Sequence, residues 1–414
     1  MRPGLTPAVV TPPVSVLYGG AHRFSADTPR KLAGIARAAL ATWAPDPDTF
    51  ARAVGAEPAR AEALYAAVRR RLEGPAAVDD LRIDFEDGYG PRADDEEDGH
   101  AHAAGVALAA CRARGLLPPR IGIRVKAWEG PTAARARRTL QRFLHAYLDA
   151  AGAPLPPGFV VTLPKVGAAE TVRRFVDALS ALEGPLGLAE DALGVELMVE
   201  TPRALLGLLE LATEAGHRLD SLHLGAYDLL SALGVLPAAQ GLGHLHCVDA
   251  RGHIGRVAAA LGVRAVDGAT TRLPLPVHRA ESEPLSEAAQ RDNLAAVVGA
   301  WRAHADAVRA ACTVGVWQGW DLHPAQLPAR YGALFDVLAD GVEDTVVRLA
   351  NFVSASAQAT RVGQAFDDAA TARGLAAHLA RAASLGVVDA SAVEARVGAR
   401  LDRLCAGEFV SAAV

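Results

Sequence analysis

The stretch GVELMVETPRALLG, residues 194–207, joins a predicted strand to a predicted helix and places one acidic residue, Glu200, at the junction. GVELMVE is apolar enough for a strand that is covered on both faces. Thr201 and Pro202 are typical N-cap and first-turn residues of a helix. Glu200 alone is explained equally well as a helix-start acid, worth about 0.3–1 kcal/mol, or as a functional carboxylate at a strand end.

Seven other β-type runs share this arrangement, each followed by an alanine-rich segment with helical spacing of its apolar residues. The runs cover residues 14–20, 80–88, 120–128, 159–166, 194–200, 221–228, 264–272 and 313–323. Strands that alternate with helices indicate βαβ units and a parallel sheet. Eight units predict a closed (β/α)8 TIM barrel. The alternative is a doubly wound open sheet, but GGAHRF after the first strand lacks its GxGxxG fingerprint.

Two regions exceed a minimal barrel. Residues 42–78 predict a helical insertion between the first two strands, and residues 341–414 predict a C-terminal helical extension. We therefore expect a catalytic barrel domain over residues 1–340, interrupted by the insertion, and a helical tail that packs on the barrel or reaches a neighbouring subunit.

The composition excludes several classes of protein. The chain has 414 residues, 51% of them hydrophobic, and a net charge of −5. No long basic run predicts nucleic-acid binding, and no apolar stretch is long enough to predict a membrane span. The four cysteines form no CxxC pair, which argues against a disulfide framework and a zinc site. The N-terminus carries no signal-peptide pattern, so we expect a cytoplasmic protein.

Charged residues follow the predicted strands, and in a TIM barrel those ends form the active-site rim. The residues are Asp84, Glu86, Asp87, Arg124, Lys126, Lys165, Glu200, Asp228, Asp267, Asp321 and His323. We expect them to gather on one rim of an apolar barrel.

Glu200 and Asp228 follow adjacent strands, so both carboxylates are expected to reach one hard cation. Mg²⁺ commonly takes one or two protein carboxylates and completes its shell with water and substrate oxygens. Arg124 is interpreted either as a partner of the acids on the second strand or as a clamp for a substrate carboxylate. Lys165 is expected to form ion pairs; a Schiff-base role would need a depressed pKa.

Histidines near the rim have structural alternatives. His323, before Pro324, is interpreted as a helix cap or packing residue, with ligand contact as the alternative. His223, inside the sixth strand, is expected to be a satisfied interior histidine. The run DDEEDGHAH, residues 94–102, is interpreted as a solvated helix start rather than a metal site.

The assembled motifs resemble the citrate lyase beta-subunit family, part of the HpcH/HpaI aldolase group of pyruvate/phosphoenolpyruvate barrels. IDFEDG resembles its LDLEDAV segment, IRVKAW its arginine strand, LPKVGAAETV its PKVES segment and LMVETPRALL its IETA segment. LGAYDLLSALG and GWDLHPAQLPARY resemble its FGXXDLAXXLG and IHPXQI segments. The match runs in order over about residues 14–330.

The resemblance implies a Mg²⁺-dependent carbon–carbon lyase or aldolase that acts on a small α-keto or hydroxy acid through a metal-stabilised enolate. It implies metal ligands at Glu200 and Asp228 and a carboxylate-binding arginine at Arg124. It also implies an aspartate at Asp367 that reaches a neighbouring subunit's site, within a trimer or hexamer. The general base stays open between Asp367, a metal-bound water and the acids of residues 84–87, with Glu86 and Asp87 as candidates.

Departures from the family pattern fall around the pocket mouth. Lys126 replaces an asparagine, WQGWD replaces a shorter loop, and GGAHRF differs from PGSNPR. These changes lie where a long cofactor would enter, so we expect a free acid as substrate ahead of an acyl-CoA thioester of malyl, citramalyl or citryl type. A non-catalytic barrel that binds an acid is the remaining alternative.

Overall fold

The computed structural model describes residues 12–280, 283–355, 360–362 and 365–409. Eight parallel strands close into one barrel, in which the last strand pairs with the first through Ser15 opposite Gly319. The predicted (β/α)8 fold is therefore confirmed. The strands are β1 Ser15–Gly20, β2 Asp80–Asp84, β3 Arg120–Arg124, β4 Val160–Leu163, β5 Gly194–Val199, β6 Leu219–Leu224, β7 Arg264–Asp267 and β8 Gln318–Asp321.

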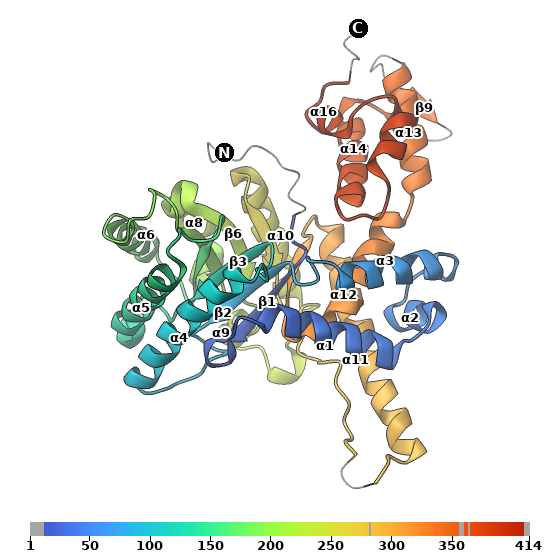
Figure 1. Ribbon diagram of the computed structural model, residues 1–414. Coiled ribbons are helices and arrows are strands. Elements are labelled where there is room, and N and C mark those ends of the chain that lie inside the picture. Colours follow the sequence, from blue (N-terminus) through green and yellow to red (C-terminus); the bar gives the residue numbers. More distant parts are fainter. Residues whose placement is uncertain (1–11, 281–282, 356–359, 363–364, 410–414) are drawn as a thin grey trace.

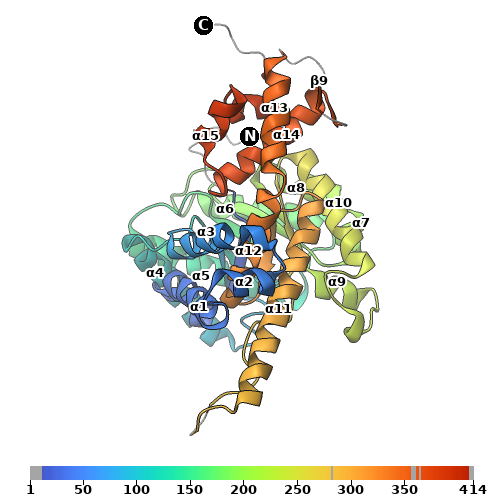
Figure 2. The same cartoon turned by 90° about the vertical axis from the view of Figure 1, so that its right-hand side faces the viewer.

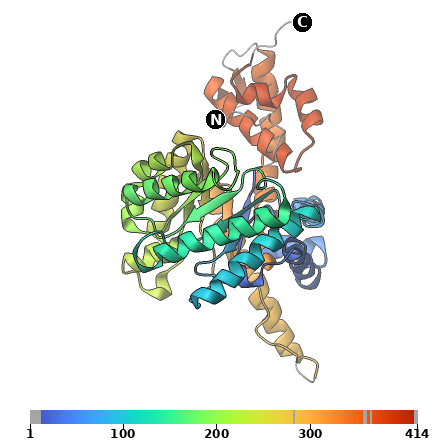
Figure 3. The ribbon, with the colours of Figure 1, turned by 60° about the vertical axis from the view of Figure 1, so that its left-hand side comes forward.

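Helices surround the barrel, with α4 to α10 on one side and α1, α11 and α12 on the other (Figures 1 and 3). They are α1 Thr28–Trp43, α4 Asp94–Ala113, α5 Ala133–Ala151, α6 Ala169–Glu183, α7 Pro202–Leu206, α8 Leu208–Ala215, α9 Ala226–Ala232, α10 Leu245–Leu261, α11 Glu287–Thr313 and α12 Leu327–Ala339. In the part of the chain that the structure describes, no helix has both the length and the apolar character needed to cross a membrane.

The predicted strands were too long at several ends. The run 313–323 begins in the last residue of α11, and only Gln318–Asp321 is strand. The run 221–228 ends as strand at Leu224, so Asp228 lies in the first turn of α9. In both places apolar residues continue beyond the strand or before it: Ala226 is buried in the first turn of α9, whereas Val314, after α11, is 45% exposed.

The insertion after the first strand consists of α2 Pro47–Val54 and α3 Ala61–Glu73. Asp46 caps α2 by accepting the backbone N–H of Thr49, and Pro47 occupies the first turn. On the face shown in Figure 2, α3 packs against α1 and α12, and α2 packs against α11 and α12. Phe50 meets Trp301 of α11 edge to face, at 6.2 Å between ring centroids. The insertion thus thickens one wall of the barrel.

The C-terminal extension comprises α13 Val342–Ser354, α14 Ala369–Ser384, α15 Ala390–Val397 and α16 Leu401–Cys405. It also contains a short antiparallel pair, β9 Thr360–Val362 and β10 Ala365–Asp367, in a segment predicted to be helical. These elements stand at one end of the molecule (Figures 1 and 2) around a hydrophobic cluster of their own. The division into a barrel domain over residues 1–340 and an extension over residues 341–414 stays a prediction.

The barrel interior contains a polar cluster, so the expectation of an apolar barrel was wrong. Arg82 is fully buried, and its Nε donates to Glu196 Oε2 at 2.6 Å and its Nη2 to Asp80 Oδ2 at 3.1 Å. Gly122 on β3 leaves the space for this side chain, because a Cβ there would lie 3.2 Å from Arg82 Cδ and 2.4 Å from Val160 O. The cluster forms a floor beneath the rim.

Candidate functional site

Glu200 and Asp228 converge on the rim, on either side of the Lys165 ammonium group. Glu200 directly follows β5 and is 2% exposed. Lys165 Nζ lies 2.6 Å from Asp228 Oδ2 and 3.6 Å from Glu200 Oε2. The same Nζ lies 3.5 Å from Asp87 Oδ2 and 3.7 Å from Glu86 Oε1. Four carboxylates, from the ends of two strands and the start of a helix, therefore surround one positive charge.

Local backbone geometry fixes the Glu200 carboxylate. Lys165 has a left-handed φ of 54°, which is unfavourable for a residue with a side chain. Its backbone N–H donates to Glu200 Oε1 at 2.5 Å. Gly225, just after β6, lies against the same side chain, and a Cβ at Gly225 would fall 2.3 Å from Glu200 Cβ. The carboxylate is thus held between two specialised backbone positions.

Arg124 ends β3 opposite Asp84 of β2 in the strand register. Its Nε and Nη2 each donate to an Asp84 carboxylate oxygen at 2.6 Å. Asp84 also accepts the backbone N–H groups of Glu86 and Gly88. The remaining guanidinium nitrogen, Nη1, lies 3.1 Å from Glu86 Oε2. Arg124 therefore pairs with the acids of the second strand, as the first interpretation expects, and its role as a clamp for a substrate carboxylate stays a prediction.

The carboxylates of the rim differ in pKa because their surroundings differ. Burial raises the pKa of Glu200 to about 8, with the Asp228 charge adding to the rise and Lys165 opposing it. Burial likewise raises the pKa of Glu86 to about 7. Burial opposes ionisation of Asp87 as well, but its hydrogen bond with Glu86 and the charges of Arg124 and Lys165 hold its pKa below the usual value. The rim thus combines carboxylates of different acidity.

The Lys165 ammonium group stays charged. Burial disfavours the Lys165 ammonium, yet Glu200, Asp228, Glu86 and Asp87 together raise its pKa above the ordinary value. The sequence analysis expected Lys165 to form ion pairs, and it does. A Schiff-base role needs a depressed pKa, so the raised pKa disfavours that alternative.

A cavity of about 370 Å³ opens beside these groups. Its lining is Tyr18, Asp84, Asp87, Gly88, Arg124, Glu200, Gly225, Ala226, Tyr227, Asp228, Ala269, Trp320 and Leu322. The lining thus combines carboxylates with Arg124 and the aromatic rings of Tyr18 and Trp320. This volume suits a small ligand.

The donors in this cavity suit a hard divalent cation. Among the described residues no three His, Cys, Asp or Glu side chains form a complete metal cluster. Glu200 and Asp228 would therefore supply two oxygen ligands, and water or substrate oxygens the rest, as Mg²⁺ permits. Lys165 now provides the positive charge between them and is 30% exposed, which leaves its side chain room to move aside. The carboxylates of Glu200 and Asp228 therefore fit a Mg²⁺ ion.

Several predicted site residues lie elsewhere. His323 caps the 3-10 turn Pro324–Gln326, where its Nδ1 accepts the Ala325 N–H at 3.2 Å, and it is not part of the 370 Å³ cavity. Asp367 is fully buried in the extension and paired with Arg348 at 2.6 Å. The structure brings neither residue to the rim. A role for Asp367 in a neighbouring subunit stays a prediction, and it would require this pair to open.

Other strand-end charges are also engaged away from the cavity. Lys126 Nζ donates to the Phe85 carbonyl at 2.6 Å. Asp267 pairs with Arg251 at 2.9 Å, and Asp321 pairs with Arg330 at 2.7 Å. The expectation that all strand-end charges share one rim was therefore wrong, because alternation along each strand turns every second side chain outward.

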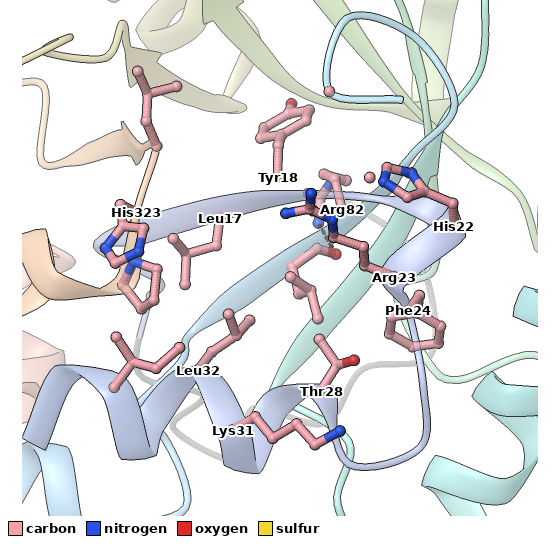
Figure 4. A pocket seen from close by; sticks show the side chains of 17 residues that line it. Leu17, Tyr18, His22, Arg23, Phe24, Thr28, Lys31, Leu32, Arg82 and His323 are labelled. Atoms are coloured by element: carbon pink, nitrogen blue, oxygen red, sulfur yellow. Dashed lines mark hydrogen bonds between the residues drawn. The ribbon is translucent and has the colours of Figure 1, made fainter. Parts of the chain in front are cut away.

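A second cavity, of about 580 Å³, lies between β1 and α1 (Figure 4). Leu17 and Leu32 face each other across it, whereas the Tyr18 ring points to the opposite side of β1. Its lining includes His323 and the cationic residues Arg23 and Lys31, neither of which has an ion-pair partner among the described residues. The two cavities share lining residues, including Gly88.

Tyr18 and Trp320 were missed as site residues by the sequence reasoning. Tyr18 lies 4.4 Å from Trp320 between ring centroids, and both rings flank the Arg124 guanidinium. Period-2 alternation along SVLYGG and QGWD would have placed both side chains inside the barrel. The same reading of DLRID and GVELMV would have indicated the buried Arg82 and Glu196.

Comparison with solved structures supports the fold. A citrate lyase from Burkholderia xenovorans LB400 superposes with a TM-score of 0.60 and 21% identity, covering 96% of this chain and 97% of that chain. A lead(II) complex of Haloferax volcanii malate synthase gives 0.48 and 21%, covering 72% and 82%. A citrate lyase beta subunit from M. tuberculosis, complexed with oxaloacetate and magnesium, gives 0.44 and 19%, covering 79% and 98%.

At this identity the likeness establishes the shared barrel, and it confirms the resemblance to citrate lyase beta-like barrels at the level of fold. A search of curated proteins found no match. A family profile described as a domain of unknown function, DUF6986, matches residues 3–411. The chain therefore belongs to the DUF6986 family.

Proposed function

We propose that this protein is a Mg²⁺-dependent carbon–carbon lyase of aldolase type that acts on a small α-keto or hydroxy acid. The observation that carries the proposal is the convergence of Glu200, Asp228 and the Nη1 end of Arg124 on one small cavity. An acid substrate needs both a hard cation and a fixed positive group, and the cavity offers a place for each.

Glu200 and Asp228 would hold the cation through carboxylate oxygens. When bound, Mg²⁺ supplies Lewis-acid polarisation of a carbonyl oxygen. Arg124 neutralises the substrate carboxylate and the negative charge that develops as the C–C bond breaks. Asp84 holds that guanidinium in place through two hydrogen bonds.

Glu86 would carry the proton. Its pKa of about 7 suits general acid–base work near neutral pH. In the cleavage direction the substrate hydroxyl proton passes to Glu86, the O–H electron pair forms the new carbonyl, and the C–C pair stays on the carbon next to the keto group. That carbon then takes a proton. Asp84 is a weaker candidate because Arg124 and two backbone N–H groups already engage it.

A CoA-thioester lyase is the second candidate. The observation in its favour is the cavity of about 580 Å³ next to the rim, whose cationic residues Arg23 and Lys31 suit an anionic cofactor. Turnover that depends on CoA separates this candidate from a free-acid aldolase. Binding of acids without turnover across a keto-acid and CoA panel favours a non-catalytic barrel.

The test is a calorimetric titration of metal-free protein with Mg²⁺, alone and with pyruvate, oxaloacetate or acetyl-CoA. We expect a keto acid to strengthen Mg²⁺ binding, and Glu200→Gln to abolish both binding and turnover while it leaves the fold intact. Glu210→Gln on the exposed face of α8 is the matched control and retains both. Unchanged turnover in Glu200→Gln, or no Mg²⁺ binding under any condition, contradicts the proposal.

A further inference from the structure

Two buried hydrogen-bond donors beside the rim cavity have no hydrogen-bond partner among the described residues. One is Arg124 Nη1, on a side chain that is 1% exposed, although the Glu86 carboxylate stands nearby. The other is the indole Nε1–H of Trp320. Buried donors are nearly always satisfied in folded proteins, so each such group requires an explanation. Both side chains line the same cavity, and a ligand oxygen there would satisfy both.

The two donors are held close together by an aromatic bracket. Arg124 Cζ lies 4.9 Å from the Tyr18 ring centroid and 5.4 Å from the Trp320 ring. Tyr18 is fixed in turn, because its hydroxyl lies 3.1 Å from His223 Nδ1. β1 and β8 are paired neighbours in the barrel, which sets the two rings side by side. The orientation of both N–H groups is therefore built into the barrel.

Asp84 limits how Arg124 meets an anion. Asp84 already accepts hydrogen bonds from Nε and Nη2 of Arg124. These two nitrogens form the edge through which a guanidinium often binds a carboxylate side-on, so that edge is not free for a ligand. A carboxylate in the cavity is left the Nη1 end instead, and the Trp320 ring packs on the same guanidinium, 5.4 Å from its Cζ. A second neutral donor at this point increases affinity for an anion without adding charge.

We propose that Trp320 is a specificity-determining residue: its indole N–H and the Nη1 end of Arg124 bind the same substrate carboxylate. The inference rests on the proposed function for the identity of the ligand, an α-keto acid. It assigns to the WQGWD segment, which departs from the family pattern, a direct role in binding.

The test is Trp320→Phe, which keeps one aromatic ring over Arg124 and removes the N–H donor together with the second ring of the indole. In calorimetric titrations with Mg²⁺ and oxaloacetate we expect affinity for oxaloacetate to fall about tenfold, as for loss of a hydrogen bond to a charged group. Affinity for Mg²⁺ alone stays unchanged. KM rises while kcat is retained, since the bond exists in both the ground state and the transition state.

Trp128→Phe is the matched control. Its indole N–H is also buried and unpartnered in the described chain, but Trp128 packs against Phe175 away from the rim cavity. We expect wild-type oxaloacetate affinity in this variant. Because either variant can lose stability, ¹⁵N-tryptophan spectra of the wild-type protein provide a second measurement: oxaloacetate shifts the Trp320 indole signal and leaves that of Trp128 in place.

The outcomes separate the two proposals. Wild-type oxaloacetate affinity in Trp320→Phe, with binding lost in Glu200→Gln, overturns the role of Trp320 and leaves the lyase proposal standing. An unshifted Trp320 indole signal at saturating oxaloacetate does the same. A wild-type protein that binds Mg²⁺ but no keto acid overturns both.

Discussion

At the scale of single residues, a few side chains and one glycine decide the chemistry of the rim. Glu200 is held by the Lys165 N–H and by the close approach of Gly225. The left-handed backbone of Lys165 and the absence of a side chain at Gly225 both help to fix the Glu200 carboxylate. Functional sites commonly store such strain.

Gly225→Ala is expected to weaken Mg²⁺ binding about 10- to 100-fold, the usual effect of disturbing the support of a metal ligand. The reason is steric, because the new Cβ would lie 2.7 Å from Glu200 Oε2 and must displace it. Isothermal calorimetry measures the effect. Gly243→Ala is the control, since a Cβ there meets nothing within 4 Å. Equal Mg²⁺ affinity in both variants would show that Glu200 does not contribute to the cation site.

Arg82→Met is expected to lower the free energy of unfolding by about 3–5 kcal/mol, because it removes the nearest counter-charge of two buried carboxylates and leaves them only the more distant Arg264. Asp80 and Glu196 are both fully buried beside it. Urea denaturation followed by circular dichroism measures the change. Arg69→Met removes an exposed pair with Glu73 and should cost no more than about 0.5 kcal/mol. A similar cost for both variants would mean that the interior cluster contributes little.

At the scale of elements, the start of α12 shows how a predicted site residue becomes a structural one. His323 Nδ1 accepts from Ala325, and Gln326 Oε1 accepts the His323 N–H at 3.1 Å. The two bonds form a reciprocal cap that directs the chain from β8 into α12. The imidazole is therefore committed to the backbone, and it faces the 580 Å³ cavity instead of the rim.

This cap predicts a dependence of stability on pH. Burial lowers the pKa of His323 below its usual value. The unfolded chain therefore binds more protons than the folded one between the folded pKa and about 6.5. The contribution is fully present above that upper value and is lost as pH falls through the folded pKa, by at most about 1.4 kcal/mol per pH unit.

His323→Asn keeps an acceptor at the cap and removes the titration. We expect a smaller loss of unfolding free energy between about pH 7.5 and about pH 5.5 than in the wild-type protein. Urea denaturation at both pH values measures it. An identical loss in the two proteins would show that His323 is not the titrating group.

At the scale of the whole molecule, two hydrophobic clusters divide the chain. One fills the barrel and its surrounding helices, and the other lies within α13 to α16. Contacts between them are specific, since His378 of α14 lies 3.0 Å from the Leu338 carbonyl and Arg381 covers the Trp317 ring at 4.5 Å. The extension is thus attached to the barrel through α14.

Phe352→Ala is expected to loosen the extension alone. Phe352 is fully buried and meets Phe409 edge to face at 5.1 Å, so its removal should cost the smaller cluster about 3–5 kcal/mol. Hydrogen exchange should accelerate in α13 to α16 and not in the barrel strands. Phe143→Ala, in the barrel cluster, should give the reverse pattern. Acceleration everywhere in both variants would mean that the two clusters unfold together.

The sequence by itself determined the barrel and the pair of acids. Strand and helix periodicities are local, and parallel strands in a barrel bring their carboxyl ends to one rim whatever the packing details. Glu200, Asp228 and Arg124 therefore line one cavity, as expected, although Asp228 lies in α9 and not at the end of β6.

Only the tertiary structure decided which charges face the cavity. The position of Lys165 among four acids, the burial of Asp367 against Arg348 and the Tyr18–Trp320 bracket all join residues far apart in the chain. Such contacts depend on side-chain direction and barrel closure. A charged residue at a strand end is compatible with an outward ion pair, as for Asp321, or an inward ligand, as for Glu200, and only the register of the closed barrel distinguishes them.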